Sequence, residues 1–322
     1  MRMGLMAAVV GVAGSLALGS GVSATSDNAA LAYYKAWATL NQELQLTLLT
    51  GDALSLTEGG ADLLGSEQES IDMLMRASHG GIADWGIDLA QGPGTLVPHL
   101  GSMRASAKVI TADALRCIEE GDKDGAAARA AGVFRMSRQT SEDEILISSL
   151  VGMAIGNLGV TLTDHLIDSG ALDARGARVV LAAIGDIEEP DRYGLRDSIM
   201  GEWRMMSEFM IKNAPERGAG KWLMEQTMFA EDPPAAKKIV GMNRSELMRE
   251  LGGFAAYHAD LLTAWDARDK AKLNDAEQRV QSGVYGALTE LLGVTMTRSF
   301  DSETESRAKL DALIKRLEEI AD

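Results

Sequence analysis

The stretch HLGSMRASAKVITADALRCIEEGDKDGAAARAAGVFRMSRQTSED, residues 99–143, decides the fold class of this protein. Two segments rich in alanine and other good helix formers flank the pair Gly121-Asp122. The pair ends one helix and leads into the next, so the stretch predicts a helical hairpin. The many small side chains would allow the two helices of this hairpin to approach each other closely.

The turn of this hairpin resembles the turn between the two helices of a tetratricopeptide-type repeat. The residues that carry the resemblance are Ala112, Ala114, Leu115, Glu120, Gly121, Asp122, Gly125 and Ala126. The glycine-based turns elsewhere, at Gly51, Gly170 and Gly185, are unevenly spaced, whereas a regular repeat protein would keep a fixed period. We therefore expect an all-α fold, an irregular array of antiparallel helical hairpins that is tetratricopeptide-like only in part.

The composition supports helices and restricts the partners. The chain has 322 residues, of which 46% are hydrophobic and only 5% aromatic, and it lacks the runs of Val, Ile, Thr and Tyr that favour strands. Its formal net charge is −16 at pH 7, and no arginine-rich stripe occurs. Because nucleic acids and anionic lipid surfaces are bound through clustered Lys and Arg, we expect neither as a partner.

The N-terminus, MRMGLMAAVVGVAGSLALGSGVSA, is typical of a secretory signal peptide. It carries one charge, Arg2, then an uncharged run that ends in Val22-Ser23-Ala24, the small residues that a signal peptidase requires. We predict cleavage after Ala24 and a periplasmic or secreted protein. The alternative is an uncleaved membrane anchor, because the run is just long enough to span a bilayer.

The mature chain is predicted to form a helical-hairpin domain over residues 25–214 and a C-terminal helical region over 215–322, packed on the first part. The boundary is placed at APERGAGKW, residues 214–222. Residues 145–163 carry no charge, which fits a membrane helix or a buried central helix. The polar and glycine residues within this run favour the buried helix, so we expect no stable membrane insertion after signal cleavage. The last helix is predicted to start behind Asp301 or Ser302.

The loop HGGIADWGIDLAQGPGTLVPHL, residues 79–100, is the first candidate binding site. Its possible ligand-binding residues are His79, Asp84, Trp85, Asp88 and His99. The stronger interpretation is structural, because a tryptophan is a large plate to bury and aspartates bond to loop amides. No metal-binding motif is present, and the single cysteine, Cys117, predicts a buried and inert thiol. We expect no metal and no cofactor.

A methionine-rich segment is the second candidate. Met206 and Met210 are spaced by four residues, as are Met224 and Met228, so each pair shares a helix face. Two amphipathic helices that fill a core are the simplest interpretation. Methionine surfaces also adapt to peptides, so a groove lined by these four residues is the alternative, and copper(I) binding is the least favoured.

A second resemblance is to a group of uncharacterised secreted helical proteins of planctomycete-type bacteria. Three segments within residues 28–210 carry it: DWGIDLAQGPGTLVPHL, CIEEGDKDGAAARAAGVFRMSRQ and LISSLVGMAIGN. The resemblance implies a location and a fold but no chemistry. We expect a non-catalytic extracytoplasmic scaffold or binding protein for a protein or peptide partner. The alternative is an enzyme or small-ligand binder that uses the loop 79–99.

Overall fold

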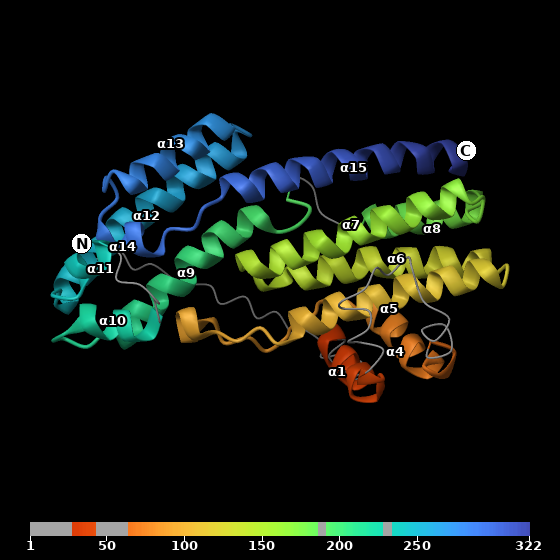
Figure 1. Ribbon diagram of the computed structural model, residues 1–322, viewed down its shortest axis with the longest axis horizontal. Helices are drawn as coiled ribbons and strands as arrows, with labels where there is room; N and C mark the ends of the chain where they lie inside the picture. The colour runs from red at the N-terminus through yellow and green to blue at the C-terminus, as the bar shows by residue number, and fades with distance from the viewer. Residues whose placement is uncertain (1–27, 43–63, 186–190, 228–233) are drawn as a thin grey trace, which may run out of the picture.

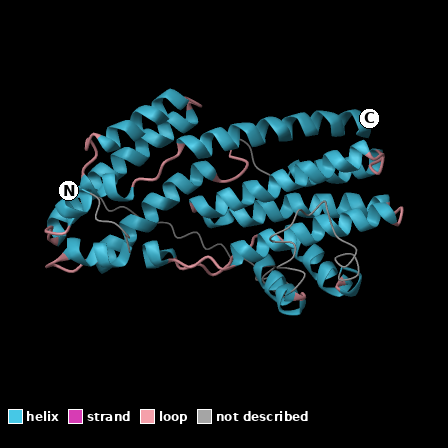
Figure 2. Cartoon of the chain, in the orientation of Figure 1, coloured by secondary structure: helices cyan, strands magenta, loops and turns pink. Residues whose placement is uncertain are grey.

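The computed structural model describes residues 28–42, 64–185, 191–227 and 234–322. Within these ranges the regular elements are helices, and no strand occurs there (Figure 2). The all-α prediction is confirmed. The predicted signal peptide, residues 1–24, and the candidate residue Met228 lie outside the described residues.

The helices of the described ranges follow one another along the chain with short connections. In order they are α1 (Ala29–Thr39), α4 (Gln68–Ser78), η1 (Leu89–Gly94), α5 (His99–Glu119), α6 (Lys123–Thr140), η2 (Ser141–Asp143), α7 (Leu146–Asp168), α8 (Ala174–Gly185), α9 (Leu195–Asn213), α10 (Ala219–Thr227), α11 (Pro234–Ile239), α12 (Arg244–Asp266), α13 (Lys270–Gln281), α14 (Ala287–Leu292) and α15 (Thr297–Ala321). The short elements η1 and η2 are 3₁₀ helices.

The turn between α5 and α6 forms where the sequence predicts it. Gly121 has φ +77°, a left-handed conformation in which glycine has no steric penalty. The amide of Asp122 bonds to the carbonyl of Cys117 at 2.8 Å, and the amide of Gly121 bonds to that of Ile118 at 3.0 Å, a Schellman-type helix end. The Asp122 side chain then accepts from the Gly125 amide and caps α6.

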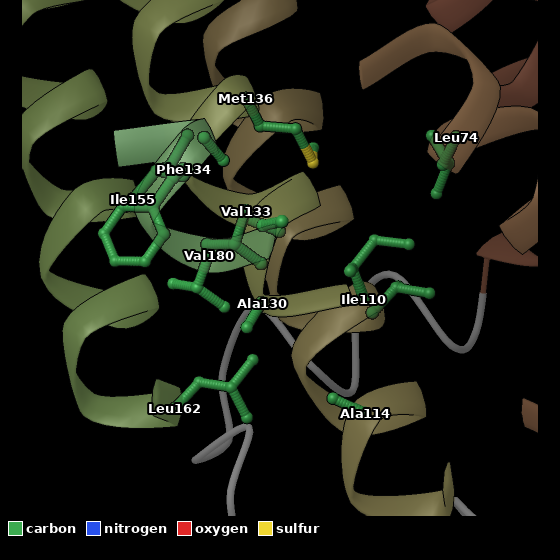
Figure 3. Packing of buried hydrophobic residues seen from close by; sticks show 14 of the residues in the cluster. Leu74, Ile110, Ala114, Ala130, Val133, Phe134, Met136, Ile155, Leu162 and Val180 are labelled. Atoms are coloured by element: carbon green, nitrogen blue, oxygen red, sulfur yellow. The ribbon is translucent and has the colours of Figure 1, made fainter. Parts of the chain in front are cut away.

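An elongated bundle of α5, α6, α7, α8 and α15 forms the largest part of the molecule, and α1 and α4 pack on one side of it (Figure 1). Helix α6 is central, because it contacts α4, α5, α7 and α8. The residues labelled in Figure 3 show the resulting core, in which Phe134 and Val133 of α6 meet Ile155 of α7 and Val180 of α8. Burial of such apolar side chains is the main favourable contribution to folding.

Helices α6 and α7 approach closely because α7 presents glycines to α6. The Ser137 hydroxyl on α6 donates to the carbonyl of Gly152 on α7 at 2.7 Å. A Cβ atom added to Gly156 would lie 3.0 Å from the Ser137 hydroxyl and 2.9 Å from a ring carbon of Tyr193. The pair of glycines spaced by four residues therefore serves close helix packing.

Helix α7 is, among the described residues, the one helix long and apolar enough to cross a membrane by length and composition. In the structure, 56% of its most apolar stretch is buried inside the molecule. Its neighbours are α5, α6, α9 and α15, which is the packing of a core helix. The expectation that the chain does not insert stably in a membrane stays a prediction.

Helix α15 connects the two ends of the molecule. Phe300, near its start, packs in a cluster with α9, α12 and α13, whereas Leu310 and Leu313 pack in the core of the long bundle. A further apolar cluster joins α9 to α10, α11, α12 and α14. The C-terminal helices thus pack on the first part of the chain. The division of the chain at residue 214 stays a prediction.

The start of α15 differs from the prediction. The helix begins at Thr297 rather than behind Asp301 or Ser302. The carboxylate of Glu277, on α13, accepts hydrogen bonds from the amides of Met296 at 2.7 Å and Thr297 at 2.8 Å. A carboxylate from another helix therefore satisfies the open amides at this helix start, a role that a local side chain usually has.

Candidate functional site

Trp85 and His99, two of the five candidate residues of the loop 79–99, lie together in an aromatic stack. The Trp85 and His99 rings are 4.5 Å apart at an angle of 12°, and Trp85 also stacks on Trp37 at 5.7 Å. Tyr33 packs against the same tryptophans. Nε2 of His99 lies 2.8 Å from a carboxylate oxygen of Asp143. Both candidate side chains are buried.

Gln139, on α6, fixes the start of the loop through hydrogen bonds. Its side-chain oxygen accepts from the Tyr33 hydroxyl at 2.6 Å, and its amide nitrogen lies 2.9 Å from the carbonyl oxygen of Gly80 and 3.3 Å from that of Gly81. Its backbone carbonyl accepts from the Trp85 indole at 3.3 Å. Because a buried amide without partners is costly, these bonds strongly favour one position of the loop.

The two candidate aspartates bond to the loop itself. Asp84 accepts from the Gly86 amide at 2.9 Å, and Asp88 accepts from the Ala90 amide at 3.0 Å. The backbone of Asp84 exchanges two hydrogen bonds with the side chain of Asn28, at 2.7 and 3.0 Å. Both aspartates are exposed. They are turn-forming residues in this structure.

His79 lies apart from the other four candidates, at the end of α4. Its Nδ1 is 2.7 Å from the carbonyl oxygen of Met75, so this nitrogen donates. Its Nε2 is 3.1 Å from a guanidinium nitrogen of Arg135, so this nitrogen accepts. The two contacts together assign a neutral ring. The enzyme alternative requires the loop residues to gather in one polar site, and the structure does not bring them together, because only Trp85 and His99 meet.

His79 instead lines an open groove of about 710 Å³ between α1 and the end of α4. We call it the α1–α4 groove. The residues that line it are Asn28, Ala29, Leu31, Ala32, Lys35, Arg76, Ala77, His79, Gly80 and Gly81. The Leu31 side chain is 55% exposed although it is apolar. The sequence indicated only His79 of this set as a candidate, because the groove forms where two helices meet through tertiary packing.

The methionine groove is not formed by the residues that the structure describes. Met210 is fully buried and Met206 nearly so, both in the apolar cluster of α9 to α14, and Met224 is half-buried. These α9 methionines fill a core, so they do not line an open groove. The reason is that the face carrying Met206 and Met210 packs against η1, α10 and α12.

A polar pocket of about 250 Å³ contains none of the candidate residues that the sequence indicated. It lies between the end of α6 and the start of α9, and its lining includes Arg138, Glu142, Asp191 and Arg192. Burial raises the pKa of both the Glu142 and the Asp191 carboxyl. Such a carboxyl can hold a proton at a higher pH than usual, which suits it to proton transfer or to a polar ligand. No local motif indicates this pocket, because its acids come from distant parts of the chain.

One further group with reactive potential, the Cys117 thiol, is buried. Burial raises the pKa of the Cys117 thiol, which disfavours the reactive thiolate. Within the described ranges, no three side chains of His, Cys, Asp or Glu are grouped to hold a metal ion. The α1–α4 groove and this polar pocket are thus two places in the described residues where a ligand could bind.

His258, on α12, makes stability depend on pH. Its Nδ1 donates to the carbonyl of Phe254 at 2.8 Å, and burial lowers its pKa to about 4. Below the ordinary histidine pKa of about 6.5, the unfolded chain binds a proton that the folded chain does not, so stability falls as the pH falls. From about pH 7 to about pH 5, we expect this residue to remove about 2 kcal/mol of unfolding free energy.

The measurement is urea unfolding of the protein and of His258→Gln at both pH values. The variant should lose less stability on acidification, by about that amount. The buried carboxyls with raised pKa, such as Glu202, act in the opposite direction in both proteins, so the comparison isolates the histidine. Equal losses in the two proteins would contradict the assignment.

Comparisons of the chain with family models, curated proteins and solved structures found no match. The resemblances to tetratricopeptide-type turns and to secreted planctomycete-type proteins thus stay expectations from the sequence. What the protein binds has to be argued from its own surface.

Proposed function

We propose that this protein is an exported, non-catalytic helical binding protein whose α1–α4 groove takes a peptide segment of a protein partner. The observation that carries the proposal is the groove itself, which is open. Apolar residues form its floor, and the apolar side chain of Leu31 is exposed there. Peptide-binding grooves of helical proteins accept apolar side chains in this way.

The groove is built on a rigid support, which favours binding. Asn28 caps α1 through the Ala30 amide and also bonds to the backbone of Asp84. The amide of Ala29 donates to the carbonyl of Ile82 at 3.0 Å, and Gln139 holds the glycines at the end of α4. A groove whose walls are held before binding loses little conformational entropy when it is occupied.

The enzyme alternative at the loop 79–99 has less support. The partners described above for its histidines and aspartates all lie outside this set of four, whereas catalytic groups must reach a common substrate. The export of the protein rests on the signal-peptide prediction. Finding the chain only in the cytosol would contradict that part of the proposal.

The test is binding of labelled short peptides of varied composition to the purified protein, measured by fluorescence polarisation. We expect a subset to bind, and Leu31→Asp to weaken that binding at least about tenfold, because a carboxylate would replace the apolar contact. Ile211→Asp is the matched control, since Ile211 is 54% exposed on α9, away from the groove. Absence of any bound peptide, or equal loss in both variants, would overturn the proposal.

A further inference from the structure

The charged residues that line the α1–α4 groove are all basic. Within the described residues its lining contains Lys35 and Arg76, beside the neutral ring of His79, and no aspartate or glutamate. The whole chain has 47 acidic and 31 basic residues, so the lining has the opposite charge to the chain as a whole. A local positive field over an apolar floor selects partners by charge as well as by fit.

The two cations of the groove are also available to bind a ligand. Among the described residues, neither the Lys35 nor the Arg76 side chain makes an ion pair or hydrogen bond, and both are exposed. Some other basic side chains of the structure are engaged by carboxylates, as Arg116 is by Glu120 and Lys270 is by Asp301. Exposed cations without a partner can pair with an incoming anion at little cost to stability.

We infer that the groove recognises an acidic peptide segment, one with carboxylates beside a leucine-like side chain. The carboxylates would pair with Lys35 and Arg76 at the rim, while the apolar side chain packs on Leu31 and Ala32. The inference rests on the proposed function and names its partner class. Long polyanions fit less well, because a net charge of −16 repels them outside the groove.

Three short capped peptides of equal length, each with the same two leucines, test the inference against the full chain. They differ only in their remaining residues, which are glutamate, glutamine or lysine. We expect the glutamate peptide to bind at least about tenfold more tightly than the glutamine peptide at low salt, with the difference shrinking as salt is added. The lysine peptide should bind least.

The double variant Lys35→Glu/Arg76→Glu should reverse the order and prefer the lysine peptide. Its matched control is Arg217→Glu/Lys221→Glu, which changes the net charge equally at exposed residues near α10. The control should keep the preference for glutamate, and circular dichroism should show unchanged helix content in both. A control that loses the preference as fully would overturn the inference, because the general field would then decide.

Three other outcomes bear on the inference and on the proposed function. If the glutamate and glutamine peptides bind equally and Leu31→Asp weakens both, the charge inference is wrong and the peptide groove stands. If no peptide binds, both fail. If vesicles of anionic phospholipid bind as tightly as the glutamate peptide and compete with it, the groove recognises a membrane surface and the inference is overturned.

Discussion

Replacing Trp85 with alanine lowers the free energy of unfolding by about 3–5 kcal/mol, the usual cost of removing a buried tryptophan. The side chain is only 6% exposed, and its ring stacks between those of Trp37 and His99. The variant would leave a cavity in this stack and would remove the bond from the indole nitrogen to the Gln139 carbonyl. Urea unfolding followed by circular dichroism measures the loss.

Two further variants test whether the loss of stability is specific to the buried Trp85 ring. Leu96→Ala, in the same loop, should change stability by less than about 0.5 kcal/mol because Leu96 is 79% exposed. Trp85→Phe should lose less than the alanine variant, since an aromatic plate remains. If Trp85 served a ligand and not the fold, the alanine variant would unfold like the original protein, and the structural role would be refuted.

Asp113→Asn should destabilise the protein by about 3 kcal/mol, the cost of breaking a buried ion pair from one side. Asp113 is completely buried on α5. One of its oxygens accepts from Arg116 at 2.9 Å and from Gln68 at 3.1 Å, and the other accepts from Arg129 at 2.8 Å. The carboxylate thus joins α4, α5 and α6, and an amide of the same shape cannot accept at both positions.

The surface pair of Asp124 and Arg175 supplies the control. Its atoms are also 2.8 Å apart, but both side chains are more than half exposed, so Asp124→Asn should cost less than about 1 kcal/mol. Both variants are compared with the original protein by urea unfolding at neutral pH. Equal stability of the two variants would show that burial does not strengthen the Asp113 network.

Some of the tertiary contacts leave no trace in the local pattern. Tyr33 and Gln139 meet through one hydrogen bond although they are far apart in the chain, and Glu142 and Asp191 share a pocket for the same reason. Helical periodicity relates residues only a few positions apart, so no pattern of this kind could find such pairs. Apart from His79, the sequence indicated no candidate residue of the α1–α4 groove, because two separate helices form this groove.

The sequence by itself determined the helices and the turn at Gly121 and Asp122, because backbone preference and capping act between neighbouring residues. It also indicated a buried helix within residues 145–163, because polar and glycine residues interrupt this uncharged run. Only the tertiary structure decided that Met206 and Met210 are core residues and that α15 starts at Thr297 under the carboxylate of Glu277. Those outcomes depend on which helix faces meet, and that is set by packing over the whole molecule.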